Sequence, residues 1–408
     1  VVLNGGKDPS LGTTVTNTYT DTVNHWASGY IEYCTQLGIV AGDGAGKFNP
    51  DATVTGSEAA KMLLVAMGYK SEVEGFTGAN WSIAVNVRAN QKALYSDLSI
   101  SVDEGLTRDD AAQMIYNALD AGVVSYEYTL VTDGSTISSS PTLIDNNDKT
   151  LLEDKFNAVK VEGVVVANEY ATLSSKSTNT DYASGVIGSA LDAGKSDIVV
   201  TNYEDQQYFK DGETRFSIST ELEDLGRTVV VYVKKNANAS KAEVLGSAIT
   251  SSDNKVVADY SSDSIKDVAD DNDLSFDANA KVAYNYASLT SLTSAVRDAN
   301  GTSGVEKLLI DTNDDGDIDY VLMNTYEFGK VTRYTTSDDG DITVTLASGF
   351  FAADDKDDVV GFDDVAKDDY VLAAYIGGKL YVEKAETVTG VLEAYKNNSK
   401  GTLTTSLT

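Results

Sequence analysis

The sequence has very little cysteine, histidine and proline, and these shortages exclude several classes of protein. The single cysteine, Cys34, permits no disulfide within the chain, and its apolar position in an expected helix predicts a small buried side chain. The single histidine, His25, leaves no histidine-rich zinc site and is the one residue on which a Ser-His-Asp triad could be built. Only 3 prolines against 33 glycines fit many tight turns and no long proline-rich linkers.

Positive charge is also scarce, with 31 basic against 63 acidic residues and a net charge of −32. Such a chain is repelled by nucleic acid and by anionic membranes, so we expect no nucleic-acid partner. No apolar run approaches the roughly 18 residues of a membrane helix, so we expect no transmembrane segment. Two explanations of the acidic excess stay open: solubility alone, or binding of divalent cations, which the clustering of aspartates favours.

The length of 408 residues predicts three or more domains. The chain begins at Val1 with neither an initiator methionine nor a signal-peptide pattern. We therefore expect a processed or incomplete chain whose export signal lies upstream.

Residues 19–69 have the apolar spacing of two amphipathic helices. The first helix carries apolar groups from His25-Trp26-Ala27 to Leu37 on one face and ends at Gly38, whereas the second begins at a capping box formed by Thr55 and Glu58. A glycine-rich loop separates the two helices.

The same plan recurs over residues 70–122, which indicates a repeat of about 50 residues. Trp81 stands where Trp26 stands in the first copy, Thr107 caps the last helix and Gly122 closes it.

The first copy resembles the S-layer homology (SLH) repeat family, and the second copy is a degenerate version of it. Residues 1–18 are expected to hold the tail of a preceding repeat and a linker. The residues that carry the resemblance are Tyr19-Thr20-Asp21, His25-Trp26-Ala27, Tyr30-Ile31, Gly38-Ile39-Val40, Gly42 to Gly46, Phe48, Pro50 and Val54-Thr55.

The resemblance implies non-covalent binding to a secondary cell-wall polysaccharide with pyruvate ketals, in grooves between repeats. Arg108 matches the family's arginine, whose guanidinium suits a carboxylate, and Asp21, Trp26 and Trp81 match its acidic and aromatic positions. Gly56 replaces the arginine in the first repeat, so at most one groove is expected to be competent. In the alternative interpretation both repeats are packing units; either interpretation places both tryptophans in the core.

From about residue 128 the pattern alternates as in strands, notably over 228–235 and 369–376, and the latter continues through a Gly-Gly turn into 379–382. A helix over 289–299 followed by a strand over 306–310 indicates a mixed insert. The predicted fold class is multidomain α plus all-β, with helical SLH repeats followed by small β-barrel or sandwich modules. The predicted domains after residue 18 are an SLH repeat (19–69), a degenerate SLH repeat (70–127), a β-rich module (128–250), a mixed α/β module (251–327), a second β-rich module (328–387) and the start of a further one (388–408).

The most clearly patterned chemical motif outside the repeats is the acidic run at 311–319. Oxygen ligands at alternate positions around a glycine suit calcium, so a calcium site is one interpretation and an acidic hairpin turn without metal is the other. Leu322 stands where an EF-hand would place its bidentate glutamate, so the run is not an EF-hand. The candidate ligands are Asp311, Asn313, Asp315, Asp317 and Asp319.

These patterns predict an extracellular structural protein of a bacterial surface layer or surface fibre, and no enzyme. It would be held on the cell wall by its SLH repeats and would self-assemble with identical subunits through acidic β-modules. The alternatives are an SLH-anchored adhesin and an SLH-tethered polysaccharide hydrolase with its catalytic module downstream.

Overall fold

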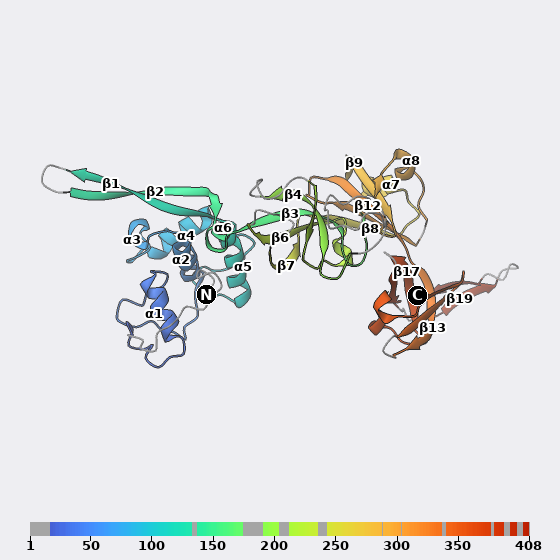
Figure 1. Cartoon of the computed structure of the whole chain (residues 1–408), viewed down its shortest axis with the longest axis horizontal. Helices are drawn as coiled ribbons and strands as arrows, with labels where there is room; N and C mark the ends of the chain where they lie inside the picture. The colour runs from blue at the N-terminus through green and yellow to red at the C-terminus, as the bar shows by residue number, and fades with distance from the viewer. Residues whose placement is uncertain are drawn as a thin grey trace. The chain divides into compact units, whose positions relative to one another are not determined.

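The computed structural model describes residues 17–132, 137–173, 191–203, 212–235, 243–287, 289–302, 304–336, 340–376, 379–386, 392–397 and 403–407. The chain divides into two compact units, 1–159 and 160–408 (Figure 1). The predictions for residues 1–16, for the turn at 377–378 and for the strand start at 388–391 lie outside the described residues.

The first unit combines helices with one long hairpin. Its elements are α1 (Ser28–Gln36), α2 (Gly56–Ala66), α3 (Ser71–Glu74), α4 (Trp81–Gln91), α5 (Arg108–Leu119), β1 (Gly122–Thr132), β2 (Ile137–Thr150) and α6 (Leu151–Phe156). Both predicted caps are confirmed: Thr55 forms a capping box with Glu58, and Thr107 forms one with Asp110.

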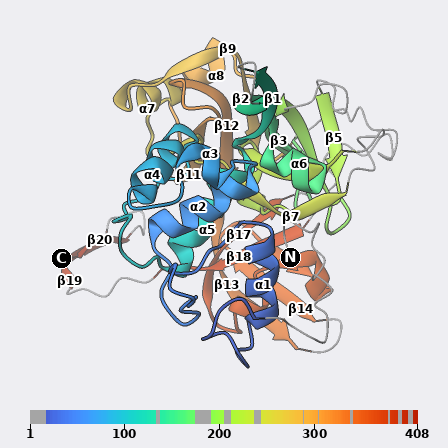
Figure 2. The ribbon, with the colours of Figure 1, turned by 90° about the vertical axis from the view of Figure 1, so that its left-hand side faces the viewer.

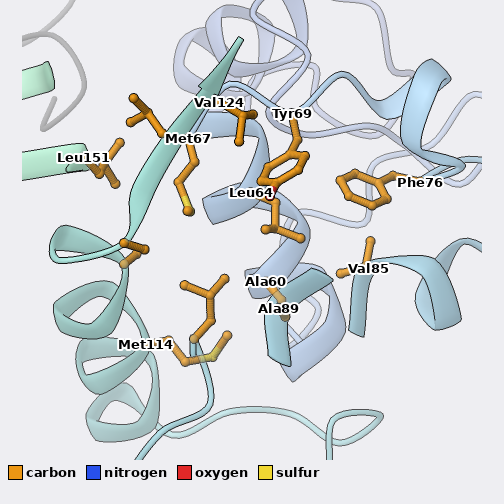
Figure 3. Packing of buried hydrophobic residues seen from close by; sticks show 14 residues of the cluster. Ala60, Leu64, Met67, Tyr69, Phe76, Val85, Ala89, Met114, Val124 and Leu151 are labelled. Carbon is orange, nitrogen blue, oxygen red and sulfur yellow. The ribbon is translucent and has the colours of Figure 1, made fainter. Parts of the chain in front are cut away.

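The core of this unit lies between α2, α4 and α5, which Figure 2 shows side by side. Leu64 of α2, Val85 and Ala89 of α4 and Met114 of α5 are completely buried there (Figure 3). Phe76, from the α3–α4 connection, is also completely buried. Residues 70–121 and helix α2 together therefore supply most of the packed core.

Two sequence predictions differ from the structure at the end of this unit. Strand β1 begins at Gly122, six residues before the expected change of pattern at 128, so the boundary at 127/128 falls inside a strand. Gly122 does not close a helix with a left-handed residue; a Cβ there would lie 2.7 Å from the Asn147 Cα on the opposing strand. Close strand approach is the physical reason for this glycine.

The second unit contains three larger sheets. The first has the order β5-β4-β3-β6-β7, the second β10-β9-β12-β11-β8 and the third β15-β14-β13-β17-β18-β16. Their strands are β3 (Ala158–Ala167), β4 (Ser196–Tyr203), β5 (Gly212–Phe216), β6 (Thr228–Lys234), β7 (Val244–Thr250), β8 (Lys255–Asp259), β9 (Ser275–Tyr284), β10 (Thr290–Ser291), β11 (Val305–Asp311), β12 (Asp317–Thr325), β13 (Glu327–Thr335), β14 (Asp341–Leu346), β15 (Phe350–Ala353), β16 (Val359–Val360), β17 (Tyr370–Ile376) and β18 (Lys379–Lys384). Two further strands, β19 (Leu392–Asn397) and β20 (Leu403–Leu407), pair with each other.

The sheets confirm a β-rich C-terminal region, and the strands expected at 228–235, 306–310, 369–376 and 379–382 are present. Over the described residues the strand orders are open, so the finer prediction of barrels or sandwiches is not confirmed.

The helix expected over 289–299 is wrong in extent. Only α8 (Ser294–Arg297) forms, because Thr290 and Ser291 pair with β9 and the Leu292 N–H donates to the Ala280 carbonyl. The helix that packs on this sheet is instead α7 (Ile265–Asp271), which buries Ile265 and Val268.

Candidate functional site

Asp21 fixes the start of the first repeat to its glycine-rich loop. Its two carboxylate oxygens accept hydrogen bonds from the Phe48 N–H at 2.9 Å and the Asn49 N–H at 2.7 Å. These amide donors hold the pKa of the Asp21 carboxyl below its ordinary value. The ring of Tyr19 packs on that of Phe48, with centroids 5.4 Å apart. Asp21 therefore shapes this loop, whatever else it contacts.

Trp26 lies on the surface, which corrects the expectation that it is a core residue. Its side chain is 83% exposed, and the ring contacts that of His25 at 5.7 Å between centroids. The reason is its position: Trp26 precedes α1, whose buried residues are Ser28, Ile31 and Glu32. The apolar face of α2 packs on α4 and α5, and over the described residues 17–54 the buried apolar side chains are those of Tyr19 and Ile31.

Trp81, the first residue of α4, is half-buried at the edge of the helical core. The Lys61 ammonium on α2 lies over its ring, 5.4 Å from the centroid. Burial lowers the pKa of Lys61, while the nearby charges of Glu58 and Glu72 act in the opposite direction. A cation beside a half-exposed indole combines an apolar face with a positive charge, the two features that an acidic sugar requires.

Arg108 is exposed at the first position of α5. The chain before it pairs with the start of α2: the Ser57 N–H donates to the Val102 carbonyl at 2.8 Å and the Leu106 N–H to the Val54 carbonyl at 2.8 Å. The starts of the last helices of both repeats therefore lie side by side.

Gly56 occupies a position where a side chain would be tightly packed. A Cβ at Gly56 would lie 3.0 Å from the Val102 Cα and 3.3 Å from Ile100 Cδ1. An arginine at this position would therefore crowd residues 100–102.

The described contacts do not bring the four predicted residues into one cluster. Among the described residues, no recorded hydrogen bond, ion pair or ring contact joins Asp21, Trp26, Trp81 and Arg108 to one another. Sequence reasoning missed Lys61, although its position between Ala60 and Leu64 on a largely apolar helix was a usable signal. Binding by the four residues stays a prediction.

The acidic run at 311–319 forms the hairpin turn between β11 and β12. Asp311 is completely buried, and its carboxylate accepts hydrogen bonds from the N–H groups of Asn313 (3.1 Å) and Gly316 (2.9 Å). The Asp319 carboxylate accepts from the Thr312 N–H (2.9 Å) and hydroxyl (2.6 Å), and burial raises its pKa.

The loop carboxylates thus accept hydrogen bonds from the turn's own N–H and hydroxyl donors. Over the described residues, no group of three or more His, Cys, Asp or Glu side chains is placed to hold a metal ion. Calcium binding by this loop stays a prediction.

None of the described helices has the length and apolar character needed to cross a bilayer.

Comparison with known proteins connects this geometry to the cell surface. Residues 18–60 match the family model of the S-layer homology domain. A cell surface protein of Thermoanaerobacter kivui is 24% identical over 224 residues, which are 54% of this chain and 27% of that protein. An uncharacterized cell wall amidase of Bacillus anthracis is 37% identical over 57 residues, 14% of this chain and 11% of that protein. The chain therefore spans only a minor part of the relatives that it matches.

Proposed function

The chain is an SLH-bearing protein of the cell-wall surface, and from this premise we propose that it is a structural surface subunit. In this proposal its SLH repeats bind a secondary cell-wall polysaccharide non-covalently, and copies of the chain associate laterally through β-structure. The observation that carries the proposal is the match of residues 18–60 to the S-layer homology domain.

The charge of the chain indicates which residues would bind the polysaccharide. A chain with net charge −32 is repelled by an anionic polysaccharide, so attachment needs cations where the sugar binds. Arg108 is exposed, and Lys61 lies against the half-buried indole of Trp81. These residues, with the exposed ring of Trp26, supply the guanidinium, ammonium and aromatic faces that a sugar carrying a pyruvate ketal requires.

The test is co-sedimentation of the purified chain with cell-wall fragments that retain the secondary polysaccharide or have been stripped of it. We expect binding only to the unstripped fragments. Arg108→Ala should weaken it by at least about tenfold, whereas Lys47→Ala, an exposed cation in the first repeat, should leave it unchanged. Equal binding to stripped fragments would overturn the anchoring proposal.

The lateral part of the proposal is tested by electron microscopy of the purified chain. Ordered sheets or fibres support it, and a monomer at every concentration contradicts it. The same grids prepared with about millimolar calcium and with a chelator test the calcium prediction separately.

The match to the amidase is the observation that favours a second candidate, a wall hydrolase. It covers 57 residues, about the length of one repeat, and gives no reason to place catalytic residues in this chain. We propose that the described chain has a binding role and no catalytic one. Release of soluble fragments from purified peptidoglycan by the chain would contradict this.

A further inference from the structure

Strands β1 and β2 form an arm that no other strand joins. They pair in one register from Val123 opposite Asn146 to Thr132 opposite Ile137, as a sheet of two strands. Figure 1 shows the pair extending past the helices of its unit. A two-stranded ribbon by itself has little stability in water, so the arm depends on contacts along its faces or edges.

The base of the arm has such contacts. The Val124 N–H donates to the Met67 carbonyl at 2.9 Å, and the Lys92 ammonium pairs with Asp145 at 2.6 Å. The Lys70 ammonium donates to the Tyr128 hydroxyl at 2.7 Å. The helical body therefore holds the arm as far as Tyr128 and sets its direction.

Beyond Tyr128 the outer edge of β1 is open. In an antiparallel ladder, alternate residues direct both backbone groups away from the partner strand. The Val124 N–H points away from β2, because it donates to the Met67 carbonyl. Tyr128, Leu130 and Thr132 are an even number of residues from Val124 in the same register, so their backbone groups also point away from β2. Among the described residues, no partner outside β2 is recorded for these three backbone N–H groups.

The outer edge of β2 is protected instead. Pro141 stands opposite Tyr128, and a proline in a ladder is tolerated where its missing N–H faces outward. It is one of only three prolines in the chain. Asp145, Asp148 and Lys149 add charge at the base of the strand, so Pro141 is the protective residue on the rungs opposite residues 128–132.

The open edge of β1 has none of these protective features. Residues 128–132 carry no charge in a chain of net charge −32, and they are β-forming residues. Leu130 is 71% exposed and Tyr128 is 50% exposed. A long, uncharged, apolar edge of this kind is a site for strand pairing.

We propose that β1 of a second copy of this chain pairs antiparallel with this edge, which joins two arms into a four-stranded sheet. The inference deepens the proposed function, since it names the surface through which copies associate. In the pairing, Leu130 lies opposite Leu130 of the other copy and Tyr128 lies opposite Thr132. The contact is therefore self-complementary about a twofold axis.

The lack of charge at this edge allows an identical partner. Elsewhere the acidic surfaces of two copies repel each other, whereas residues 128–132 carry no charge on either copy. A basic partner would be drawn to the acidic surface elsewhere. Association through the arm should strengthen with ionic strength, because salt screens the repulsion of two chains of charge −32.

The experiment is sedimentation velocity of the full chain over a range of concentrations at low and high salt, with two matched proline variants. Leu130→Pro blocks the outer edge of β1, whereas Ser139→Pro lies on the same rung and blocks the edge of β2. Both substitutions leave the β1–β2 hydrogen bonds intact, because the replaced N–H groups face outward.

We expect wild type and Ser139→Pro to dimerise alike, more at high salt, and Leu130→Pro to associate at least about tenfold more weakly. Circular dichroism verifies that both variants fold. In a Cys34→Ser background, Leu130→Cys should form a disulfide-linked dimer on mild oxidation and Ser139→Cys should not.

Equal association of Leu130→Pro and wild type would overturn the arm as the contact while leaving lateral assembly standing. A wild-type chain that stays monomeric would overturn both. Equal crosslinking of the two cysteine variants would contradict the choice of edge. Wall binding, measured on the same proteins, is independent of all three outcomes.

Discussion

The two repeats of the helical unit differ in where their residues are used. The first repeat carries nearly all of the family signature, yet Trp26 is on the surface and Asp21 and Tyr19 hold a loop. The second repeat has lost the glycine-rich loop, yet it contributes Phe76, Val85 and other completely buried side chains. The residues that carry the family resemblance are therefore not the residues that form the core. The former shape a loop and an exposed face, whereas the core forms where α2 packs against residues 70–121.

The largest effect that would sharpen this comparison is expected at Phe76. Phe76→Ala should lower the free energy of unfolding of the helical unit by about 3–5 kcal/mol, because it empties a completely buried site. Phe48→Ala, at a half-buried site in the first repeat, should cost less than half of that. Chemical denaturation followed by circular dichroism measures both, and equal losses would break the comparison.

The next largest effect is expected where the second repeat crowds the first. Gly56→Arg restores the family's arginine but should destabilise the unit by about 1–3 kcal/mol, because its side chain meets Val102 and Ile100. The converse change, Arg108→Gly at an exposed helix start, should alter stability by less than about 1 kcal/mol. A stable Gly56→Arg variant with stronger wall binding would show that the first groove needs only its arginine.

The sequence predicted most of what depends on local pattern. The capping boxes at Thr55 and Thr107 and the strands at 228–235 and 369–376 follow from spacing and side-chain type, and all four are present. The sequence did not predict the short extent of α8. Directly after the edge strand β10, the Leu292 N–H donates to the Ala280 carbonyl instead of joining a helix, and no local pattern in the sequence shows this.

The exposure of Trp26 was missed for a related reason. An apolar residue at helical spacing faces a core only if a second element covers it, and α2 packs elsewhere. For the candidate site, the sequence identified residue types, but their distances depend on how the repeats pack.

A smaller effect is expected at Asp21. Its folded pKa is lowered by the Phe48 amide, so its carboxylate contributes stability above the unfolded pKa of about 3.9 and loses it as the pH falls through the folded value. Asp21→Asn should therefore speed hydrogen exchange at Phe48 and Asn49 at neutral pH, with the difference from wild type closing in acid. Asp51→Asn serves as the control, because the Asp51 side chain is 89% exposed and contacts His25 rather than the amides of Phe48 and Asn49.

The smallest effect on folding is expected at Trp26. Trp26→Ala removes the largest side chain of the first repeat, yet at 83% exposure it should change the free energy of unfolding by less than about 0.5 kcal/mol. Because the proposed function assigns this exposed ring to sugar binding, the substitution should weaken binding to unstripped wall fragments. Denaturation and co-sedimentation of the same protein separate the two roles. A loss of stability close to that of Phe76→Ala would show that Trp26 packs against part of the chain, and would remove the comparison's main support.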